Sequence, residues 1–229
     1  MPLPTGLMLV VKQEFVLTDF VESGTYYGET AVWASSHFAR VTTIEYSRML
    51  YEKARDCNSK IKNIEFVLGD SRQVLKQVCS RLTGPALFWL DAHWSAGETY
   101  GEGDECPLLA ELKAIVASEW PHYIFIDDAH MFLSPPPRPH RVEQWPTIGE
   151  VFAALQWGKH SYYIVVIENV IVAVPEAAKR IVARYCQDFN TRALRARAGI
   201  NGDRGSQARR GWIKGMFGRM WKSARSRNR

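Results

Sequence analysis

The sequence is short of cysteine and lacks any long apolar run. Its four cysteines, in 229 residues, form no C-x-x-C pair, which excludes the usual zinc-binding patterns and gives no disulfide framework. No run of about 18 uncharged apolar residues occurs, so no transmembrane helix is predicted. The first residues also lack the basic leader and small-residue cleavage site of a secretory signal. These absences predict a cytoplasmic protein with reduced thiols.

Acidic residues are almost missing from one end of the chain. From Arg192 to Arg229 there are 12 Lys and Arg residues and one acid, a local charge of +11. The remainder carries 17 basic and 23 acidic residues, or −6. A hydrophobic content of 46% is enough for the core of one globular domain. We therefore predict a domain over residues 1–190 and a basic, Gly- and Arg-rich tail over residues 191–229.

Apolar runs of strand length alternate with segments of helical periodicity. Strands are predicted at residues 17–22, 41–45, 64–68, 86–91, 123–127, 162–167 and 170–174, and helices at residues 29–38, 46–57, 71–82, 107–118 and 147–157. This alternation predicts an α/β fold with a Rossmann-like, doubly wound, mostly parallel seven-stranded sheet. Only Glu168 and Asn169 separate the last two strands, which predicts a hairpin and an antiparallel edge strand.

Acidic residues stand at or just beyond the ends of the first five predicted strands. They are Glu22, Glu45, Asp70, Asp91, and Asp127 with Asp128. In parallel α/β sheets, ligands bind beyond the carboxyl ends of the strands. Because unpaired buried charge is costly, we expect these acids to face solvent, a cation, or a ligand rich in hydroxyl and amino groups. A polar, cationic nucleoside meets that description.

The loop after the first predicted strand contains glycine at two places. Gly24 lets the backbone pass close to a ligand, and Gly28 relieves crowding where the next helix begins. Tyr26 stands where the dinucleotide motif G-x-G-x-x-G has its middle glycine, and Glu22 would repel a pyrophosphate. The loop therefore favours a ligand with ammonium and sulfonium groups over NAD.

The ends of the next two strands predict contacts to an adenosine. Glu45 is placed to accept both ribose hydroxyls, and Tyr46 beside it can flank the adenine. Asp70 can accept a hydrogen bond from the adenine amino group, while Ser71 caps the following helix. Taken in order at strand ends, these residues predict an adenosyl-binding site.

Four runs of sequence carry a family resemblance. E-S-G-T-Y-Y-G, T-I-E-Y, G-D-S and L-D-A-H-W-S-A-G resemble the class I S-adenosylmethionine (SAM)-dependent methyltransferases, and the resemblance covers residues 19–175. The usual central glycine of the family is missing from the first loop. The resemblance implies that the methionine part of SAM contacts Glu22, Gly24 and Gly28, the ribose contacts Glu45, and the adenine contacts Asp70 and Ser71.

Three carboxylates are predicted to converge at the ends of the fourth and fifth strands. Asp91 ends one strand, and Asp127 and Asp128 end the next. Close anions repel each other unless a cation lies among them, and all-oxygen ligation suits Mg²⁺. The pattern resembles the metal-dependent O-methyltransferases of the catechol and sugar-modifying types, which implies that these three residues bind Mg²⁺.

His93 is the predicted general base. It stands where the metal-dependent family places its base, although that base is usually a lysine or an aspartate. A two-residue offset from Asp91 puts both side chains on the same side of the strand. His93 would take the proton of a metal-bound hydroxyl, whose oxygen then attacks the sulfonium methyl. His130 and His140 are alternative bases, and a structural, hydrogen-bonded role is the other interpretation of His93.

The methyl acceptor is predicted only by class, as a small molecule, a sugar or a glycan. The acid-rich loop at residues 95–106 follows the fourth strand and is suited to act as a lid or to bind a polyol. The segment after the fifth strand contains Arg138, His140 and Arg141, which are suited to clamp an anionic group.

The basic tail suggests a second kind of partner. Residues 211–225 carry Trp, Met and Phe at helical spacing among basic residues, which suits an interfacial helix on an anionic membrane. The alternatives are a nucleic-acid-binding arm, with or without RNA methylation, and a solubilising end with no partner. Nucleic acid is the less favoured partner because three converging carboxylates would repel a polyanion. The sequence makes no prediction of oligomeric state.

Overall fold

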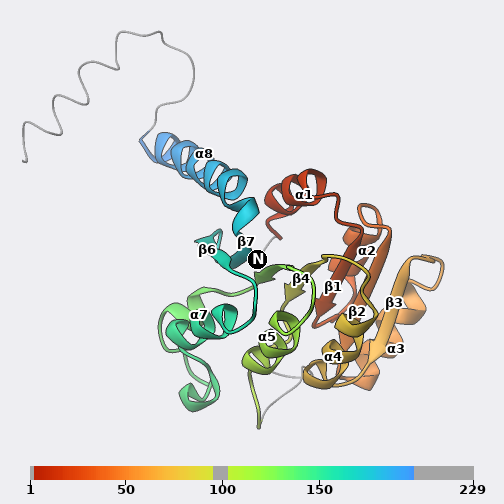
Figure 1. Cartoon of the computed structure of the whole chain (residues 1–229). Coiled ribbons are helices and arrows are strands. Elements are labelled where there is room, and N and C mark those ends of the chain that lie inside the picture. Colours follow the sequence, from red (N-terminus) through yellow and green to blue (C-terminus); the bar gives the residue numbers. More distant parts are fainter. Residues whose placement is uncertain (1–2, 95–102, 199–229) are drawn as a thin grey trace, which may run out of the picture. The chain divides into compact units, whose positions relative to one another are not determined.

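The structure is a computed structural model that describes residues 3–94 and 103–198 (Figure 1). The chain divides into two compact units, Met1–Cys186 and Gln187–Arg229. The first unit contains the whole sheet. In the second, the described residues belong mainly to the C-terminal half of helix α8 (Lys179–Arg197). That helix therefore continues past residue 190, and the predicted membrane-binding segment lies outside the described residues.

The described part of the chain contains no helix that is both long and apolar enough to cross a membrane. All four cysteines are free thiols.

A seven-stranded sheet forms the centre of the first unit. Its strands are β1 (Asp19–Ser23), β2 (Arg40–Glu45), β3 (Ile64–Leu68), β4 (Leu87–Leu90), β5 (Tyr123–Ile126), β6 (Tyr162–Ile167) and β7 (Val170–Pro175). The order across the sheet is β3-β2-β1-β4-β5-β7-β6. The first five strands pair in parallel, and β7 pairs antiparallel with both β5 and β6. The predicted Rossmann-like sheet with an antiparallel pairing at one edge is confirmed, and β7 lies one place inside edge strand β6.

The register of the parallel strands brings their carboxyl ends into line. Ser23 of β1 pairs with Ile44 of β2 on one side and with Leu90 of β4 on the other. Leu90 in turn pairs with Ile126 of β5. The residues that directly follow these four positions therefore form one row along the edge of the sheet.

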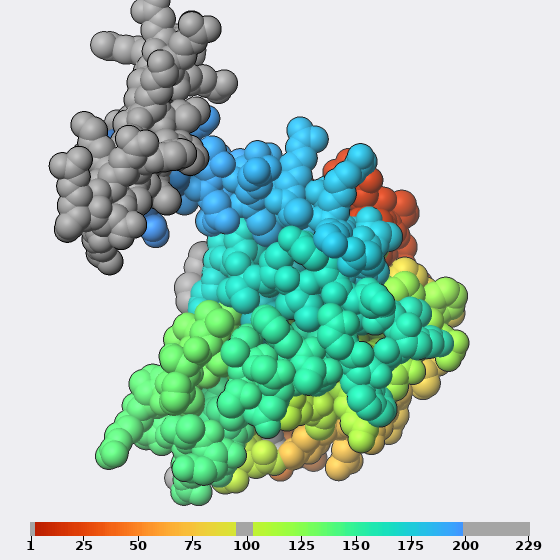
Figure 2. Space-filling model, turned by 60° about the vertical axis from the view of Figure 1, so that its left-hand side comes forward, coloured from red at the N-terminus to blue at the C-terminus, as the bar shows by residue number. Residues whose placement is uncertain are grey.

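Helices cover both faces of the sheet (Figure 1). They are α1 (Thr5–Glu14), α2 (Glu29–Ser35), α3 (Arg48–Cys57), α4 (Ser71–Arg81), α5 (Leu108–Val116), α6 (His130–Leu133) and α7 (Ile148–Gln156), with short 3-10 turns at Val142–Gln144 and Glu176–Ala178. The segments predicted as helices all contain a helix, whereas α1, α6 and α8 were not predicted. Residues 130–175, coloured green to teal, form one continuous surface in Figure 2.

Alternating side chains along β1 define the two layers of the core. Val21 belongs to the cluster that packs against α4, α5 and α7. Phe20, its neighbour in the chain, points to the opposite face, where its ring lies 5.2 Å from that of Phe38 and 6.2 Å from that of Trp33 on α2. Burial of each such side chain stabilises the fold by about 1.5–3 kcal/mol. The sheet thereby supplies a rigid platform for the loops at its carboxyl edge.

Candidate active site

Gly24 is the first residue in the row at the carboxyl edge of the sheet. Its φ of +90° is a left-handed conformation that side chains other than glycine rarely adopt. A Cβ atom at this position would lie 2.3 Å from the carbonyl oxygen of Asp91. The loop after β1 therefore passes directly over the end of β4, as the sequence predicted from glycine at this point.

Glu45, the last residue of β2, lies in the same row, and its carboxylate binds two loops. Its Oε2 accepts a hydrogen bond of 2.9 Å from the backbone N–H of Tyr26, and its Oε1 accepts one of 2.8 Å from the N–H of Ser47. Each carboxylate oxygen can accept two hydrogen bonds, so each keeps one acceptor position for a ligand. Tyr46 lies beside it with 52% of its surface exposed.

Glu22 does not face solvent, contrary to the expectation for acids at strand ends. The residue is 1% exposed, and its Oε2 accepts a hydrogen bond of 2.6 Å from Thr43 Oγ1. Thr43 lies in turn 2.6 Å from Thr25 Oγ1 in the first loop. Burial raises the pKa of Glu22 to about 8, although the Thr43 hydrogen bond opposes the shift. The argument from buried charge fails here because the carboxyl group is neutral at pH 7 and bonded to a hydroxyl.

Glu22→Gln is expected to remove a pH dependence of stability. The pKa of Glu22 is raised from 4.5 to about 8 in the folded chain, so the folded state binds the extra proton between these values. The stability that this bound proton provides is fully present below pH 4.5, the ordinary pKa of the group. It is lost as the pH rises through the folded-state pKa of about 8. At about 1.4 kcal/mol per pKa unit, Gln should raise the melting temperature by several degrees at pH 9 and little at pH 5. An equal shift at both pH values in calorimetry would contradict a buried, neutral Glu22.

Asp70, and not Ser71, caps helix α4. The Asp70 carboxylate accepts a hydrogen bond of 3.0 Å from the backbone N–H of Arg72 and forms an ion pair of 2.8 Å with the Arg72 guanidinium. These contacts lower the pKa of Asp70. Ser71 is the first residue of the helix and is buried. The capping role was assigned one residue too late because both side chains favour the N-cap position.

A histidine lies between two carboxylates at the ends of β4 and β5. His93 Nε2 is 3.1 Å from Asp128 Oδ2, and His93 Nδ1 is 3.6 Å from Asp91 Oδ1. The His93 side chain is only 8% exposed. Its ring lies 5.3 Å from that of Trp145. The structure thus brings His93, Asp91 and Asp128 together, as the sequence predicted.

The carboxylates and the histidine shift one another's protonation. Burial and the nearby Asp127 and Asp128 raise the pKa of Asp91 to about 7, although His93 opposes this shift. Burial also raises the pKa of Asp127, whereas the hydrogen bond from His93 lowers the pKa of Asp128. Burial alone would lower the pKa of His93, but its hydrogen bond to Asp128 and the charge of Asp91 outweigh burial and raise the pKa.

The predicted magnesium ligands lie close to one another but are not arranged as a metal site. Among residues 3–94 and 103–198, no group of three or more His, Cys, Asp or Glu side chains is placed to hold a metal ion. Asp128 already accepts hydrogen bonds at both oxygens, from His93 and from Asn169. Asp127 Oδ1 accepts one of 2.7 Å from the backbone N–H of Asp128. In this arrangement the imidazole of His93 takes the position between the carboxylates.

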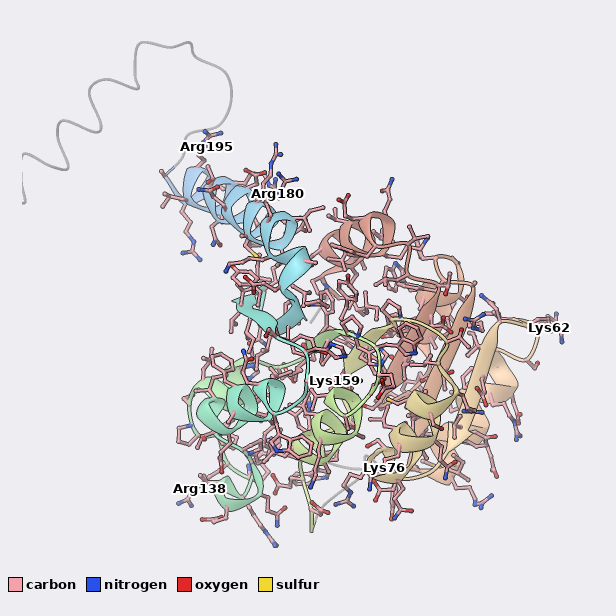
Figure 3. The ribbon with its side chains drawn as sticks, viewed as in Figure 1. Lys62, Lys76, Arg138, Lys159, Arg180 and Arg195 are labelled. Carbon is pink, nitrogen blue, oxygen red and sulfur yellow. The ribbon has the colours of Figure 1, made fainter. Side chains whose placement is uncertain are left out.

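Glu105 is a site residue that the sequence did not single out. It is 1% exposed and accepts hydrogen bonds from Trp145 Nε1 at 2.6 Å, the backbone N–H of Arg141 at 3.0 Å and His140 Nδ1 at 3.1 Å. Burial acts to raise the pKa of Glu105, but these bonds outweigh it and lower the pKa. His140 and the Arg141 backbone thus bind Glu105, while Arg138 points outward (Figure 3). Glu105 gave no signal because it is one of four acids in a polar loop.

Comparison with solved structures identifies the fold. An O-methyltransferase from Bacillus cereus in complex with S-adenosylhomocysteine (SAH) is 17% identical over 77% of this chain and 83% of its own, with a TM-score of 0.55. The chain has the fold of the class I methyltransferases. A candidate O-methyltransferase from Klebsiella pneumoniae is 14% identical over 76% of this chain and 81% of its own, with a TM-score of 0.54. A candidate rRNA methylase from Clostridium thermocellum is 10% identical over 76% and 98%, with a TM-score of 0.53.

No family model and no curated protein matches the sequence of this methyltransferase-fold chain. The likeness is therefore one of backbone structure, and the roles of individual residues rest on the geometry above.

Proposed function

We propose that the protein is a SAM-dependent O-methyltransferase. One observation carries the proposal: the Glu45 carboxylate, fixed by the N–H groups of Tyr26 and Ser47, stands at the edge of a methyltransferase-type sheet in one row with Gly24 and Asp91. Ligands of such sheets bind at this edge. The solved structure with SAH that shares the fold supports the choice of cofactor.

The residues at this edge fit the parts of SAM. Glu45 has acceptor positions for the two ribose hydroxyls, and the exposed Tyr46 offers a ring to the adenine. Asp70 stands after β3 on the adenine side, where Arg72 holds its carboxylate. Gly24 lets the first loop pass over the end of β4 and Gly28 lets helix α2 begin close to Asn58, so we assign the methionine part to this loop, with Glu22 beneath it as a neutral, buried support. SAM supplies an electrophilic methyl group, and the residues described next act on the acceptor.

His93 is the proposed general base. The carboxylates of Asp91 and Asp128 hold its ring on both sides, at 3.6 and 3.1 Å, which fixes the ring plane and increases its basicity. With Nε2–H donated to Asp128, His93 Nδ1 would take the proton of an acceptor hydroxyl as that oxygen gains the methyl group that SAM would supply, leaving SAH. Trp145, behind His93, excludes water from this side of the ring. Positioning of the acceptor against His93 supplies a large part of the rate.

The proposed acceptor is a hydroxyl on a small molecule, a sugar or a glycan, in a cytoplasmic protein. Peripheral contact of residues 211–225 with an anionic membrane remains part of the proposal and rests on sequence pattern alone. RNA methylation is the second candidate function, favoured by the likeness to a candidate rRNA methylase. The carboxylates at the site oppose it, because a phosphate backbone would meet Asp91, Asp127 and Asp128.

Titration with SAH tests the proposed cofactor site without knowledge of the acceptor. Wild-type protein is expected to bind SAH in calorimetry, and Glu45→Gln to bind about 10- to 100-fold more weakly, because a charged acceptor of two ribose hydrogen bonds is lost. Glu65→Gln is the matched control, since Glu65 lies exposed on neighbouring β3 and pairs with Arg81. Equal affinities of the two variants would refute the assignment of Glu45.

Magnesium is a separate proposal with Asp91, Asp127 and Asp128 as ligands. The oxygen chemistry of the three side chains supports it. A metal at Asp128 would compete with the hydrogen bonds that its two oxygens accept from His93 and Asn169. Mn²⁺, followed by electron paramagnetic resonance and displaced by Mg²⁺, is expected to bind the wild-type chain and to bind Asp127→Asn at least about tenfold more weakly. No bound Mn²⁺, together with turnover unaffected by EDTA, would remove magnesium from the account.

A further inference from the structure

The tight turn between β6 and β7 reaches the candidate active site. Its two residues, Glu168 and Asn169, have φ values of +50° and +64°. Asparagine readily adopts a positive φ, so the sequence alone accounts for Asn169 only as a turn residue. Asn169 nevertheless makes four hydrogen bonds outside the hairpin, all to the segment that follows β5, and one of them joins its Oδ1 to His130 Nδ1 at 3.0 Å.

These four hydrogen bonds hold three successive residues, Asp128, Ala129 and His130. The Asn169 carbonyl oxygen accepts a bond of 2.7 Å from the N–H of Ala129, and its Oδ1 accepts one of 2.9 Å from the N–H of His130. Its Nδ2 donates a bond of 3.1 Å to Asp128 Oδ1. The orientation of the amide follows from its partners, because the reverse orientation would place an NH₂ group against a backbone N–H.

Asp128 needs such a support. Its φ is +51°, a left-handed conformation that is strained for a residue with a side chain. Its Oδ2 accepts the bond from His93 Nε2 at 3.1 Å, while its Oδ1 accepts the bond from Asn169. The two oxygens of one carboxylate thus connect the β6–β7 turn to the imidazole of His93.

We propose that Asn169 is a positioning residue, which fixes Asp128 in its strained conformation and thereby the ring of His93. This inference rests on the proposed function, in which His93 is the base. Asn169 acts through Asp128 and has no contact with the reacting atoms in this assignment. The β6–β7 turn is thereby connected, through Asp128, to the proposed base at the ends of β4 and β5.

Two substitutions in the same turn separate this role from the needs of the turn. Asn169→Gly keeps a residue that adopts positive φ but deletes the amide, and Glu168→Gly makes the matching change at an exposed neighbour. Asn169→Gly is expected to lower kcat about 10- to 100-fold, with KM for SAM and SAH affinity within about twofold of wild type. Glu168→Gly is expected to keep wild-type kcat. Equal effects of the two variants, or unchanged kcat in Asn169→Gly, would overturn the proposal.

A double-mutant cycle tests whether Asn169 acts through Asp128. In an Asp128→Asn background, Asn169→Gly is expected to lower kcat by less than about twofold further, because the two changes disrupt one contact. Independent, multiplicative losses would contradict positioning through Asp128. Asn169→Asp is a second variant that also tolerates the turn and sets a carboxylate against Asp128, with the same expected loss.

Crystal structures give a readout that does not depend on the acceptor. The contact between His93 Nε2 and Asp128 Oδ2, 3.1 Å in the parent chain, is expected to be lost in Asn169→Gly and kept in Glu168→Gly. A preserved contact in Asn169→Gly would refute the positioning role. If wild-type protein neither binds SAH nor transfers methyl groups, the proposed function fails, and the structures still decide what Asn169 positions.

Discussion

Gly24→Ala is expected to abolish SAH binding and to lower the melting temperature by roughly 10 °C or more. Two effects act together at this residue. A φ of +90° is strained for alanine, and the new Cβ would lie 2.3 Å from the backbone oxygen of Asp91. Such strain costs about 1–3 kcal/mol, and overpacking against a backbone atom about 1–3 kcal/mol more, because no side-chain rotation relieves it.

Thermal unfolding and SAH titration of Gly24→Ala check this expectation together. The matched control is Gly84→Ala, because a Cβ at Gly84 would meet no atom within 4 Å. The control should bind SAH as the wild type does and melt within a few degrees of it. A Gly24→Ala protein with wild-type SAH affinity would show that the first loop does not pass over the end of β4 as described.

His93→Gln is expected to lower methyl transfer about 10²- to 10⁴-fold, with SAH affinity within about twofold of wild type. The hydrogen bond of 3.1 Å between His93 Nε2 and Asp128 has a counterpart in the variant, because the glutamine amide can also donate to Asp128. The change therefore removes only the base. The measurement is release of SAH from SAM with whichever catechol, sugar or glycan supports turnover by the wild-type protein. His160→Ala is the control, because His160 is bonded to the Glu119 carbonyl, away from the carboxylate cluster.

The same assay compares the alternative bases. His140 is bound to Glu105 and His130 to Asn169, so each has a structural partner in the described residues. Their alanine variants should therefore lose less activity than His93→Gln. A larger loss for either one, with turnover retained in His93→Gln, would move the base to that residue.

Local pattern predicted the strands and most of the helices because strand-length runs rich in apolar residues, bounded by turn residues, alternate with segments of helical periodicity. Ile64–Leu68 and Tyr162–Ile167 begin and end where the sequence placed them. Helix α1 was missed, since Pro4 at its N-cap makes no side-chain capping bond and its residues read as an apolar run without a helix start. The position of β7 between β5 and β6 depends on long-range pairing that periodicity does not contain.

Some residues of the candidate site were likewise predictable from local pattern, and others depend on partners that are distant in sequence. Glu45 and Asp91 were predictable because each lies at the carboxyl end of a strand, Glu45 as the last residue of β2 and Asp91 directly after β4. Asn169 and Glu105 were not, since their partners Asp128 and Trp145 lie 41 and 40 residues away in sequence. Burial of Glu22 against Thr43 also escaped prediction, because a hydroxyl on the neighbouring strand decides whether that carboxyl group stays neutral.

A crystal structure of the full chain grown with SAH tests the central claim most directly. The account predicts both ribose hydroxyls within about 3.2 Å of the Glu45 carboxylate, the adenine against Tyr46, and the sulfur on the side of His93. SAH bound elsewhere on the molecule, or crystals that hold none at saturating SAH, would contradict a cofactor site at this edge of the sheet.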